Sequence, residues 1–341
     1  MTARRRILPV FVPHLGCPND CVFCNQRRIS GAVQSVSAEN VRRALETVAG
    51  KNEQYELAFY GGSFTAIPSR QQEVLLGAAL PFLRSGLLCG IRLSTRPDAI
   101  DDEILGRLER YGVTTVELGA QSMSDSVLRR CRRGHTAEQT ARAAALIRQR
   151  GFSLILQMMT GLPGSSKALD LDTAERIIAL RPDGVRIYPT VIIADTDLAQ
   201  LWQRGEYAEH TVESAVDTCA AILPLFERAG IPVIRLGLNP TEELSGGAAL
   251  GGAYHPALGE LVYSRVRRNE AEALLRDVSP GESVALGIRR GLLSQLVGQH
   301  GANRQWLKET FSLREVKMLP VDAEDDRIRL LNSCKLRKNM S

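Results

Sequence analysis

The stretch ILPVFVPHLGCPNDCVFC, residues 7–24, joins a short apolar run to a loop that carries three closely spaced cysteines. The run over residues 7–12 predicts a β-strand that ends directly before this loop. Three thiolates spaced C-x3-C-x2-C, at Cys17, Cys21 and Cys24, suit three corners of one iron–sulfur cube and leave one iron open for a non-protein ligand. A zinc site is the alternative, with His14 as the fourth ligand, although zinc ribbons usually bring a second C-x2-C pair that this chain lacks.

Length and composition favour a folded protein of two domains, or one barrel-sized domain with a small appendage. The chain has 341 residues, of which 44% are apolar, and no apolar run is long enough to span a bilayer. Its seven cysteines are an odd number, and four of them are dispersed, so a disulfide framework is not expected. With a start that does not resemble a secretory signal, these features predict a reducing, cytoplasmic location and no membrane association.

Basic residues outnumber acidic ones only slightly, giving a net charge of +5. They are clustered, however, and clusters can be solvated faces as easily as nucleic-acid contacts. The clusters are Arg129–Arg133, Arg265–Arg268 and Lys335–Lys338.

Downstream of the cysteines, β-rich runs alternate with amphipathic stretches. Such alternation requires parallel strands joined by right-handed crossovers, and it predicts an α/β fold, a partial (β/α)6 TIM-like barrel. The expected strands are residues 7–12, 56–60, 91–95, 114–118, 153–159 and 184–188, and the expected helices are residues 38–48, 70–83, 99–111, 138–150 and 170–180.

Polar and glycine residues follow the strands at the end where such barrels place their chemistry. Gly61-Gly62-Ser63 follows the second strand, Ser94 lies at the end of the third, and Gln121 follows the fourth. Taken singly, the glycines could form a tight turn and Gln121 a cap. Jointly, on successive strand ends, they predict a binding site.

The pattern changes near residue 240, where a glycine-rich stretch begins. We therefore predict a barrel domain over residues 1–240 and a small α+β domain over residues 241–341. A strand at 283–288, helices at 291–297 and 302–311 and a strand at 313–319 are expected in the second domain. Gly298-Gln299-His300-Gly301 lies between its helices.

The cysteine motif after the first strand of a partial barrel resembles the radical S-adenosylmethionine (radical SAM) superfamily. That resemblance implies a 4Fe-4S cluster on the three cysteines, whose open iron chelates SAM, and reductive cleavage of SAM to a 5′-deoxyadenosyl radical. Gly61, Gly62 and Ser63 resemble the family's glycine motif, and Phe23 resembles the aromatic residue that meets the adenine. Gln121 and Arg133 resemble residues that hold the ribose and carboxylate of SAM in coproporphyrinogen-oxidase-like members. Ser94 stands where relatives often have a glutamate.

Over residues 7–235 the chain resembles the radical SAM domain of the Elongator catalytic subunit, a family that modifies wobble uridine in transfer RNA (tRNA) with acetyl-CoA. Strings such as Ser94-Thr95-Arg96-Pro97-Asp98, Arg133-Gly134-His135-Thr136 and Ile187-Tyr188-Pro189-Thr190 carry the resemblance. The chain departs from that family in its cysteine spacing and in Gln157 and Arg186, where the family tends to have His and Lys. The roughly 100 residues after the barrel are too few for an acetyltransferase fold and lack an acetyl-CoA loop, so no acetyl-CoA domain is expected in this chain.

The G-x-x-G sequence of residues 298–301, between two helices, resembles the loop of the KH module. In that module the loop lets a nucleic-acid backbone lie against its amides. Nearby Arg289, Arg290, Arg304 and Lys308 would attract phosphate. The alternative is a simple turn between helices, and KH modules prefer an apolar residue where Arg304 stands.

These features favour a radical SAM enzyme that acts on RNA, with tRNA as the expected partner and flavodoxin or ferredoxin as the expected kind of electron donor. A radical SAM oxidase or decarboxylase of a small molecule, such as a porphyrin precursor, is the alternative. A noncatalytic iron–sulfur protein that binds RNA or handles haem is a third.

Overall fold

The computed structural model describes residues 6–12, 17, 21–25, 36–51, 53–242 and 244–331. The chain forms two compact units, one of Met1–Ala215 with Leu225–Tyr254 and the other of Val216–Pro224 with His255–Ser341. The boundary predicted after residue 240 falls inside the first unit, and the functional division into two domains stays a prediction. His14, Cys334 and the basic run at 335–338 lie outside the described residues.

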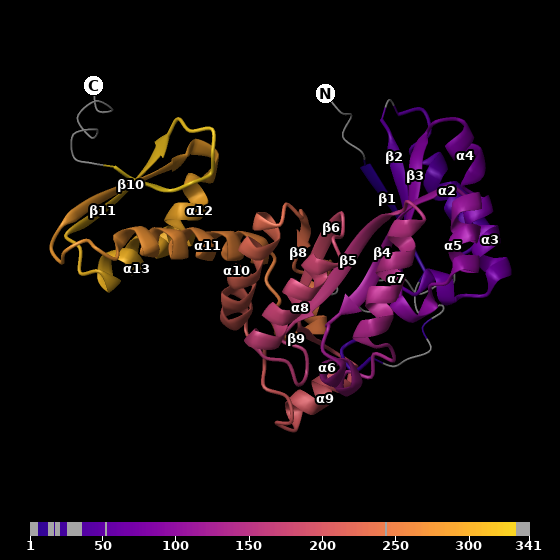
Figure 1. The fold of residues 1–341 in the computed structure, drawn as a ribbon, viewed down its shortest axis with the longest axis horizontal. Coiled ribbons are helices and arrows are strands. Elements are labelled where there is room, and N and C mark those ends of the chain that lie inside the picture. Colours follow the sequence, from indigo (N-terminus) through magenta and orange to yellow (C-terminus); the bar gives the residue numbers. More distant parts are fainter. Residues whose placement is uncertain are drawn as a thin grey trace. The chain divides into compact units, whose positions relative to one another are not determined.

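A parallel sheet of seven strands forms the centre of the first unit, in the order β1-β2-β3-β4-β5-β6-β8 (Figure 1). This confirms the predicted α/β partial barrel and all six predicted strands. It corrects their number, because β8 is a seventh strand whose four residues are too few to show a pattern. The strands are β1 (Arg6–Phe11), β2 (Tyr55–Tyr60), β3 (Leu88–Thr95), β4 (Val113–Gln121), β5 (Ser153–Thr160), β6 (Gly184–Pro189) and β8 (Val233–Leu236).

Helices cross from each strand to the next. The helix α7 illustrates the local cause: it begins at a capping box in which the Thr136 side chain accepts from the Gln139 backbone and the Gln139 side chain from that of Thr136. It packs against β4 and β5 through an apolar face that includes Ile147. The helices are α2 (Ala38–Glu46), α3 (Ser69–Gly77), α4 (Leu80–Arg84), α5 (Asp102–Arg110), α6 (Asp125–Arg130), α7 (Ala137–Gln149), α8 (Lys167–Ala179), α9 (Asp197–Gln203) and α10 (Val212–Arg228), with short 3-10 turns η1 (Phe64–Ala66) and η2 (Pro97–Ala99).

A small antiparallel sheet of β7 (Val191–Ile193) and β9 (Ala249–Gly252) completes the first unit. The segment η3 (Leu244–Ala248) leads into β9. Gly252 has φ +82°, and a Cβ there would lie 2.7 Å from the carbonyl oxygen of Thr190, so only glycine fits. The glycine-rich stretch expected to separate two domains is therefore part of the first unit.

The second unit contains a three-stranded sheet in the order β11-β10-β12. The central strand β10 is parallel to β11 and antiparallel to β12. The predicted strand-helix-helix-strand order is confirmed, while α11 and β12 were not foreseen. Its elements are α11 (Leu258–Leu275), β10 (Ser283–Arg289), η4 (Arg290–Leu292), α12 (Leu293–Val297), η5 (Gln299–Gly301), α13 (Ala302–Thr310), β11 (Glu315–Val321) and β12 (Arg329–Leu331).

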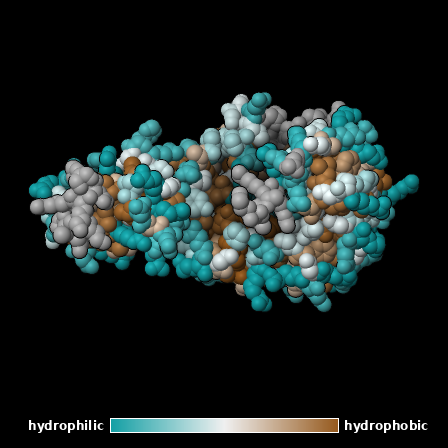
Figure 2. Space-filling model, turned by 90° about the horizontal axis from the view of Figure 1, so that it is seen from above, coloured by the Kyte–Doolittle hydropathy of each residue, from teal (hydrophilic) through white to brown (hydrophobic). Residues whose placement is uncertain are grey.

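Apolar side chains are buried within each unit. Leu286, Leu296 and Leu307 form part of the core of the second unit. The face of the molecule in Figure 2 carries many hydrophilic residues, drawn in teal, with hydrophobic areas, drawn in brown, between them. None of the described helices is long and apolar enough to cross a membrane.

Candidate functional site

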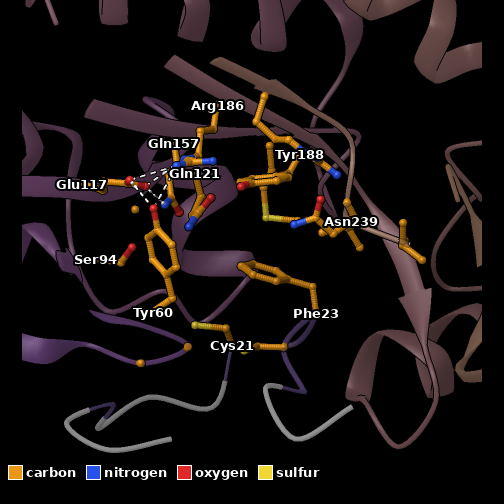
Figure 3. A pocket seen from close by; sticks show the side chains of 18 of the residues that line it. Cys21, Phe23, Tyr60, Ser94, Glu117, Gln121, Gln157, Arg186, Tyr188 and Asn239 are labelled. Carbon is orange, nitrogen blue, oxygen red and sulfur yellow. Dashed lines mark hydrogen bonds and ion pairs between the residues drawn. The ribbon is translucent and has the colours of Figure 1, made fainter. Parts of the chain in front are cut away.

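A cavity of about 760 Å³ lies at the C-terminal ends of the strands of the first unit (Figure 3). The structure brings all the predicted barrel site residues to its wall, although their roles stay predictions. These residues are Cys17, Cys21, Phe23, Cys24, Gly61, Gly62, Ser63, Ser94, Gln121 and Arg133.

The cysteine loop is anchored by main-chain hydrogen bonds on both sides of Val22. The amide of Val22 donates to the carbonyl of Cys131 at 3.2 Å, and the amide of Leu198 donates to the carbonyl of Val22 at 2.8 Å. No disulfide involves Cys17, Cys21 or Cys24 among the described residues. Within the described part of the chain no three metal-type side chains are gathered in a ligating arrangement. The structure therefore brings the three thiols to one pocket without closing a metal site.

Arg133 reaches the cysteine loop from the segment after α6. Its Nη1 donates to Sγ of Cys21 at 3.5 Å, and its Nη2 donates to the carbonyl of Gly119 at 2.8 Å. A Cβ on Gly119 would lie 2.6 Å from Nη2 of Arg133, so glycine is required where the guanidinium crosses β4. Arg133 thus presents a fixed, buried guanidinium to the pocket.

Gln121 has a φ of +65°, which is unusual for a residue with a side chain. The register between β4 and β5 shifts between Gly119 and Gln121, which places this residue on a bulge. Backbone strain of this kind gathers at functional sites. Oε1 of Gln121 and Oγ of Ser94 are both buried and have no hydrogen-bond partner among the described residues. Buried polar atoms are rarely left unpaired, so these two atoms point to a polar ligand in the pocket.

His135 supports the same bulge from behind. Its Nε2 lies 3.2 Å from the carbonyl oxygen of Ala120. Burial, with a contribution from the nearby Arg133 charge, lowers the pKa of His135 to about 4. The ring is therefore neutral at neutral pH and adds no further charge beside Arg133.

A buried network of charged and polar side chains, which was not predicted from the sequence, forms another part of the pocket wall. Glu117 accepts hydrogen bonds from the side chains of four residues on β2, β3, β5 and β6 (Figure 3). The donor distances are 2.9 Å from Tyr60, 3.0 Å from Arg92, 3.1 Å from Gln157 and, at their shortest, 2.9 Å from Arg186.

The network balances its own charges. Burial would raise the pKa of Glu117, but the Arg186 and Arg92 guanidiniums outweigh it and lower that pKa. Arg92 also pairs with Glu56 at 2.6 Å, so two arginines meet two carboxylates. Burial and the Glu117 charge raise the pKa of Tyr60. The signal in the sequence was the presence of charged residues inside otherwise apolar strands.

Comparison with known families gives two matches that together cover most of this unit. A model of the radical SAM superfamily matches residues 11–177, and a model of the radical SAM C-terminal domain matches residues 182–268. The chain belongs to the radical SAM superfamily. The predicted family is confirmed, and this protein is a radical SAM enzyme.

Two relatives are similar in sequence to the radical SAM part of this chain. The chain is 28% identical over 250 residues to the tRNA uridine(34) acetyltransferase of Methanocaldococcus infernus, covering 66% of this chain and 45% of that protein. It is 33% identical over 177 residues to Elongator complex protein 3 of Schizosaccharomyces pombe, covering 51% of this chain and 32% of that protein. The chain spans less than half the length of these relatives, and the predicted resemblance to the radical SAM domain of Elongator is confirmed.

Two solved structures share the fold. The archaeal Methanocaldococcus infernus Elp3, with an N-terminal deletion, superposes with a TM-score of 0.62 at 22% identity, over 79% of this chain and 64% of that one. Coproporphyrinogen III oxidase from Escherichia coli superposes with a TM-score of 0.51 at 18% identity, over 67% and 53% of the two chains.

The family implies a 4Fe-4S cluster and SAM, and the pocket of this radical SAM enzyme fits both groups. Three thiols on its wall match three iron ligands, and the unpaired polar atoms of Ser94 and Gln121 match polar groups of SAM. Gly61, on the pocket wall at the end of β2, has φ +93°, a left-handed conformation that favours glycine.

The side of the pocket formed by β6 and β8 carries polar residues that are not among the predicted site residues. Tyr188, Arg235 and Asn239 line it, and Figure 3 shows Tyr188 and Asn239 across the pocket from Glu117 and Tyr60. Nε of Arg235 donates to the carbonyl of Gly237 at 3.0 Å, and no carboxylate pairs with Arg235 within the described residues. Since β8 was not predicted, Arg235 could not be placed at this wall from its sequence position.

In the second unit the Arg265–Arg268 cluster proves to be largely structural. Arg265 pairs with Asp217, Arg267 pairs with Glu270 at 2.8 Å, and Arg268 lies over the Trp306 ring at 4.3 Å. Arg265 and Arg267 are also buried, so the expectation of a solvated face is wrong for these two side chains.

The loop Gly298–Gly301 joins α12 to α13 as predicted. Gly298, Gly301 and His300 all have positive φ. A Cβ on Gly298 would lie 3.0 Å from the amide nitrogen of Asn303, so close packing already accounts for this glycine. Binding of RNA by Gly298, Gln299, His300 and Gly301 stays a prediction.

Proposed function

We propose that this radical SAM enzyme modifies RNA, with tRNA as its substrate. The observation that carries the proposal is the likeness of its radical SAM part to proteins named tRNA uridine(34) acetyltransferase. The pocket supports it, because unused polar groups remain beyond those suited to the cluster and SAM.

In this proposal Cys17, Cys21 and Cys24 hold three irons of the cluster. The backbone at Gly61–Ser63 and the side chains of Ser94, Gln121 and Arg133 hold SAM, and Phe23 packs against its adenine. With the cluster and SAM bound, one-electron reduction of SAM would break a carbon–sulfur bond and supply methionine and a 5′-deoxyadenosyl radical, which would take a hydrogen atom from the substrate.

The protein's own residues then position and shield the reacting groups. The guanidinium of Arg133 offers paired donors to a carboxylate, and its bond to Gly119 fixes its direction. The Glu117 network presents no net charge, so it can contact a neutral base without attracting a counter-ion. Phe23 and Met159 contribute apolar wall and help to exclude water.

The substrate would occupy the side of the pocket lined by Tyr188, Arg235 and Asn239. Arg235 has no carboxylate partner within the described residues, and a guanidinium suits a phosphate oxygen. We assign it to a phosphate next to the modified nucleotide. Tyr188 and Asn239 can donate and accept hydrogen bonds at a base edge.

The second unit would hold the RNA outside the reacting nucleotide. The loop Gly298–Gly301 is our candidate for this contact. Arg290, Arg304 and Lys308 lie close to it in the sequence, and their exposed side chains could attract phosphate. Arg289, by contrast, pairs with Asp326 at 2.6 Å, and this carboxylate offsets the charge that Arg289 could offer to a phosphate.

The test compares the modified nucleosides of tRNA from a strain lacking this protein with those of its parent. One nucleoside should be absent or replaced by its precursor, and the wild-type chain should restore it. A variant with Cys17, Cys21 and Cys24 all replaced by Ala should not. If the tRNA profiles are identical while a porphyrin precursor accumulates, the small-molecule alternative is correct.

A further inference from the structure

Arg96 is the largest of the described side chains that are almost completely inaccessible to solvent, with 1% exposure. It follows Thr95, which lines the pocket, at the end of β3. A guanidinium stays charged at any ordinary pH, so such burial needs hydrogen-bonding partners for its five donors.

Two of its three nitrogens have such partners. Nε donates to Oδ1 of Asp98 at 2.9 Å, and Nη2 donates both to Oδ2 of Asp98 at 3.0 Å and to the carbonyl of Arg133 at 2.8 Å. The third nitrogen, Nη1, is buried and has no hydrogen-bond partner among the described residues. The side chain is therefore held in place with one donor group unused.

Cys17 and Thr95, the residue before Arg96, line the same pocket. Burial would lower the pKa of Arg96, but Asp98 and, after it, Cys17 raise that pKa. A thiolate that ligates iron remains a hydrogen-bond acceptor, and hydrogen bonds to ligand sulfurs help to set the potential of iron–sulfur clusters. The unused donor and the ligand sulfur are thus complementary.

We infer that Arg96 is a positioning residue for the iron–sulfur cluster. Its Nη1 donates to the sulfur of Cys17 when that sulfur ligates iron, while its Nη2 fixes the main chain of Arg133, whose own Nη1 lies 3.5 Å from Sγ of Cys21. Two guanidiniums then face two ligand sulfurs. Positive charge and donors at these sulfurs stabilise the added electron and raise the reduction potential. The inference rests on membership of the superfamily and does not require RNA as the substrate.

The test measures the reduction potential of the anaerobically reconstituted cluster by titration with dithionite, with the reduced cluster detected by electron paramagnetic resonance. Arg96→Met should make the potential more negative by at least 59 mV, the tenfold change of a one-electron couple. Arg96→Lys keeps the charge and should shift the potential less. Arg107→Met is the matched control, because Arg107 is also buried in this unit but contacts Gln72 and Glu103 outside the pocket.

Asp98→Asn gives a second, opposite readout. It removes the carboxylate that offsets the charge of Arg96, so the potential should become more positive. An unchanged potential in Arg96→Met, or an equal shift in Arg107→Met, overturns the inference. If Arg96→Met cannot retain a cluster, Asp98→Asn decides: an unchanged or more negative potential contradicts it.

Discussion

At the scale of single residues, arginines organise the pocket by committing their donors to different acceptors. Arg186 and Arg92 neutralise Glu117, Arg133 faces Cys21 and crosses Gly119, and Arg235 is left without a carboxylate among the described residues. A charged hydrogen bond contributes about 1.5–3 kcal/mol. Each guanidinium therefore has a separate effect when it is replaced.

Replacing Arg133 by Ala should weaken SAM binding by roughly 10- to 100-fold, because the variant loses the charged donors assigned to the SAM carboxylate. The iron content of the reconstituted protein should stay the same, since the arginine is not an iron ligand. Calorimetric titration with SAM gives the affinity, and Arg132→Ala is the neighbouring control, as Arg132 pairs with Asp197 instead. An Arg133→Ala variant that binds SAM as tightly as the parent removes this assignment.

At the scale of elements, His210 links the end of β5 to the start of α10. Its Nε2 lies 3.1 Å from Oγ1 of Thr160, and its Nδ1 lies 3.1 Å from Oγ of Ser214. A Cβ on Gly161 would lie 2.1 Å from Cγ of His210, so the glycine after β5 makes room for this ring. The ring is buried, and burial lowers its pKa to about 4.

This lowered pKa predicts a loss of stability in acid. Between pH 6.5 and about 4 the unfolded chain binds a proton at His210 that the folded chain does not, so the free energy of unfolding falls with falling pH, by up to about 3 kcal/mol. Urea unfolding of His210→Asn across this range should show a smaller decrease than the parent. His300→Asn, at an exposed position, should not change the decrease.

Two other buried groups, His135 and Asp170, have shifted pKa values in the same pH range and are present in both proteins. The lowered pKa of His135 also makes the free energy of unfolding fall as the pH falls. Burial raises the pKa of Asp170 to about 6, which makes the free energy of unfolding rise as the pH falls. The difference between parent and variant therefore isolates His210. Equal pH dependence in the two proteins would show that His210 is not the cause.

The sequence predicted long, regular strands and glycine-marked strand ends well, because periodicity and local chemistry determine them. It could not predict β8, whose four residues carry no pattern, and so it missed Arg235 on the pocket wall. It also missed the Glu117 network, since Glu117 and its partners come from five strands and only the sheet brings them together. Gln121 was found as a motif, but its positive φ follows from the bulge and not from residue type.

At the scale of the whole molecule, the first unit contains the pocket lined by the three cysteines, and the second unit contains the loop that is expected to bind RNA. Replacing Gln299 and His300 by Asp puts two negative charges where a phosphate backbone is expected. The affinity for tRNA should fall, and cleavage of SAM without RNA should persist. The log–log slope of affinity against salt should lose roughly 0.7 for each phosphate contact removed from a single strand.

The matched control places the same two charges elsewhere in the second unit, with Asn269→Asp and Ser279→Asp at exposed positions. This variant should bind tRNA much like the parent. If both double variants bind tRNA equally well, the loop is only a turn between α12 and α13.

The most direct test of the account is whether tRNA stimulates radical formation by this protein. Reconstituted protein, SAM and dithionite are incubated without oxygen, and 5′-deoxyadenosine is measured with tRNA from the deletion strain, with tRNA from its parent, and without RNA. Transfer RNA from the deletion strain should accelerate 5′-deoxyadenosine formation more than parental tRNA does, and the triple cysteine variant should form none. Formation that no tRNA accelerates, but that a porphyrin precursor does, would contradict it.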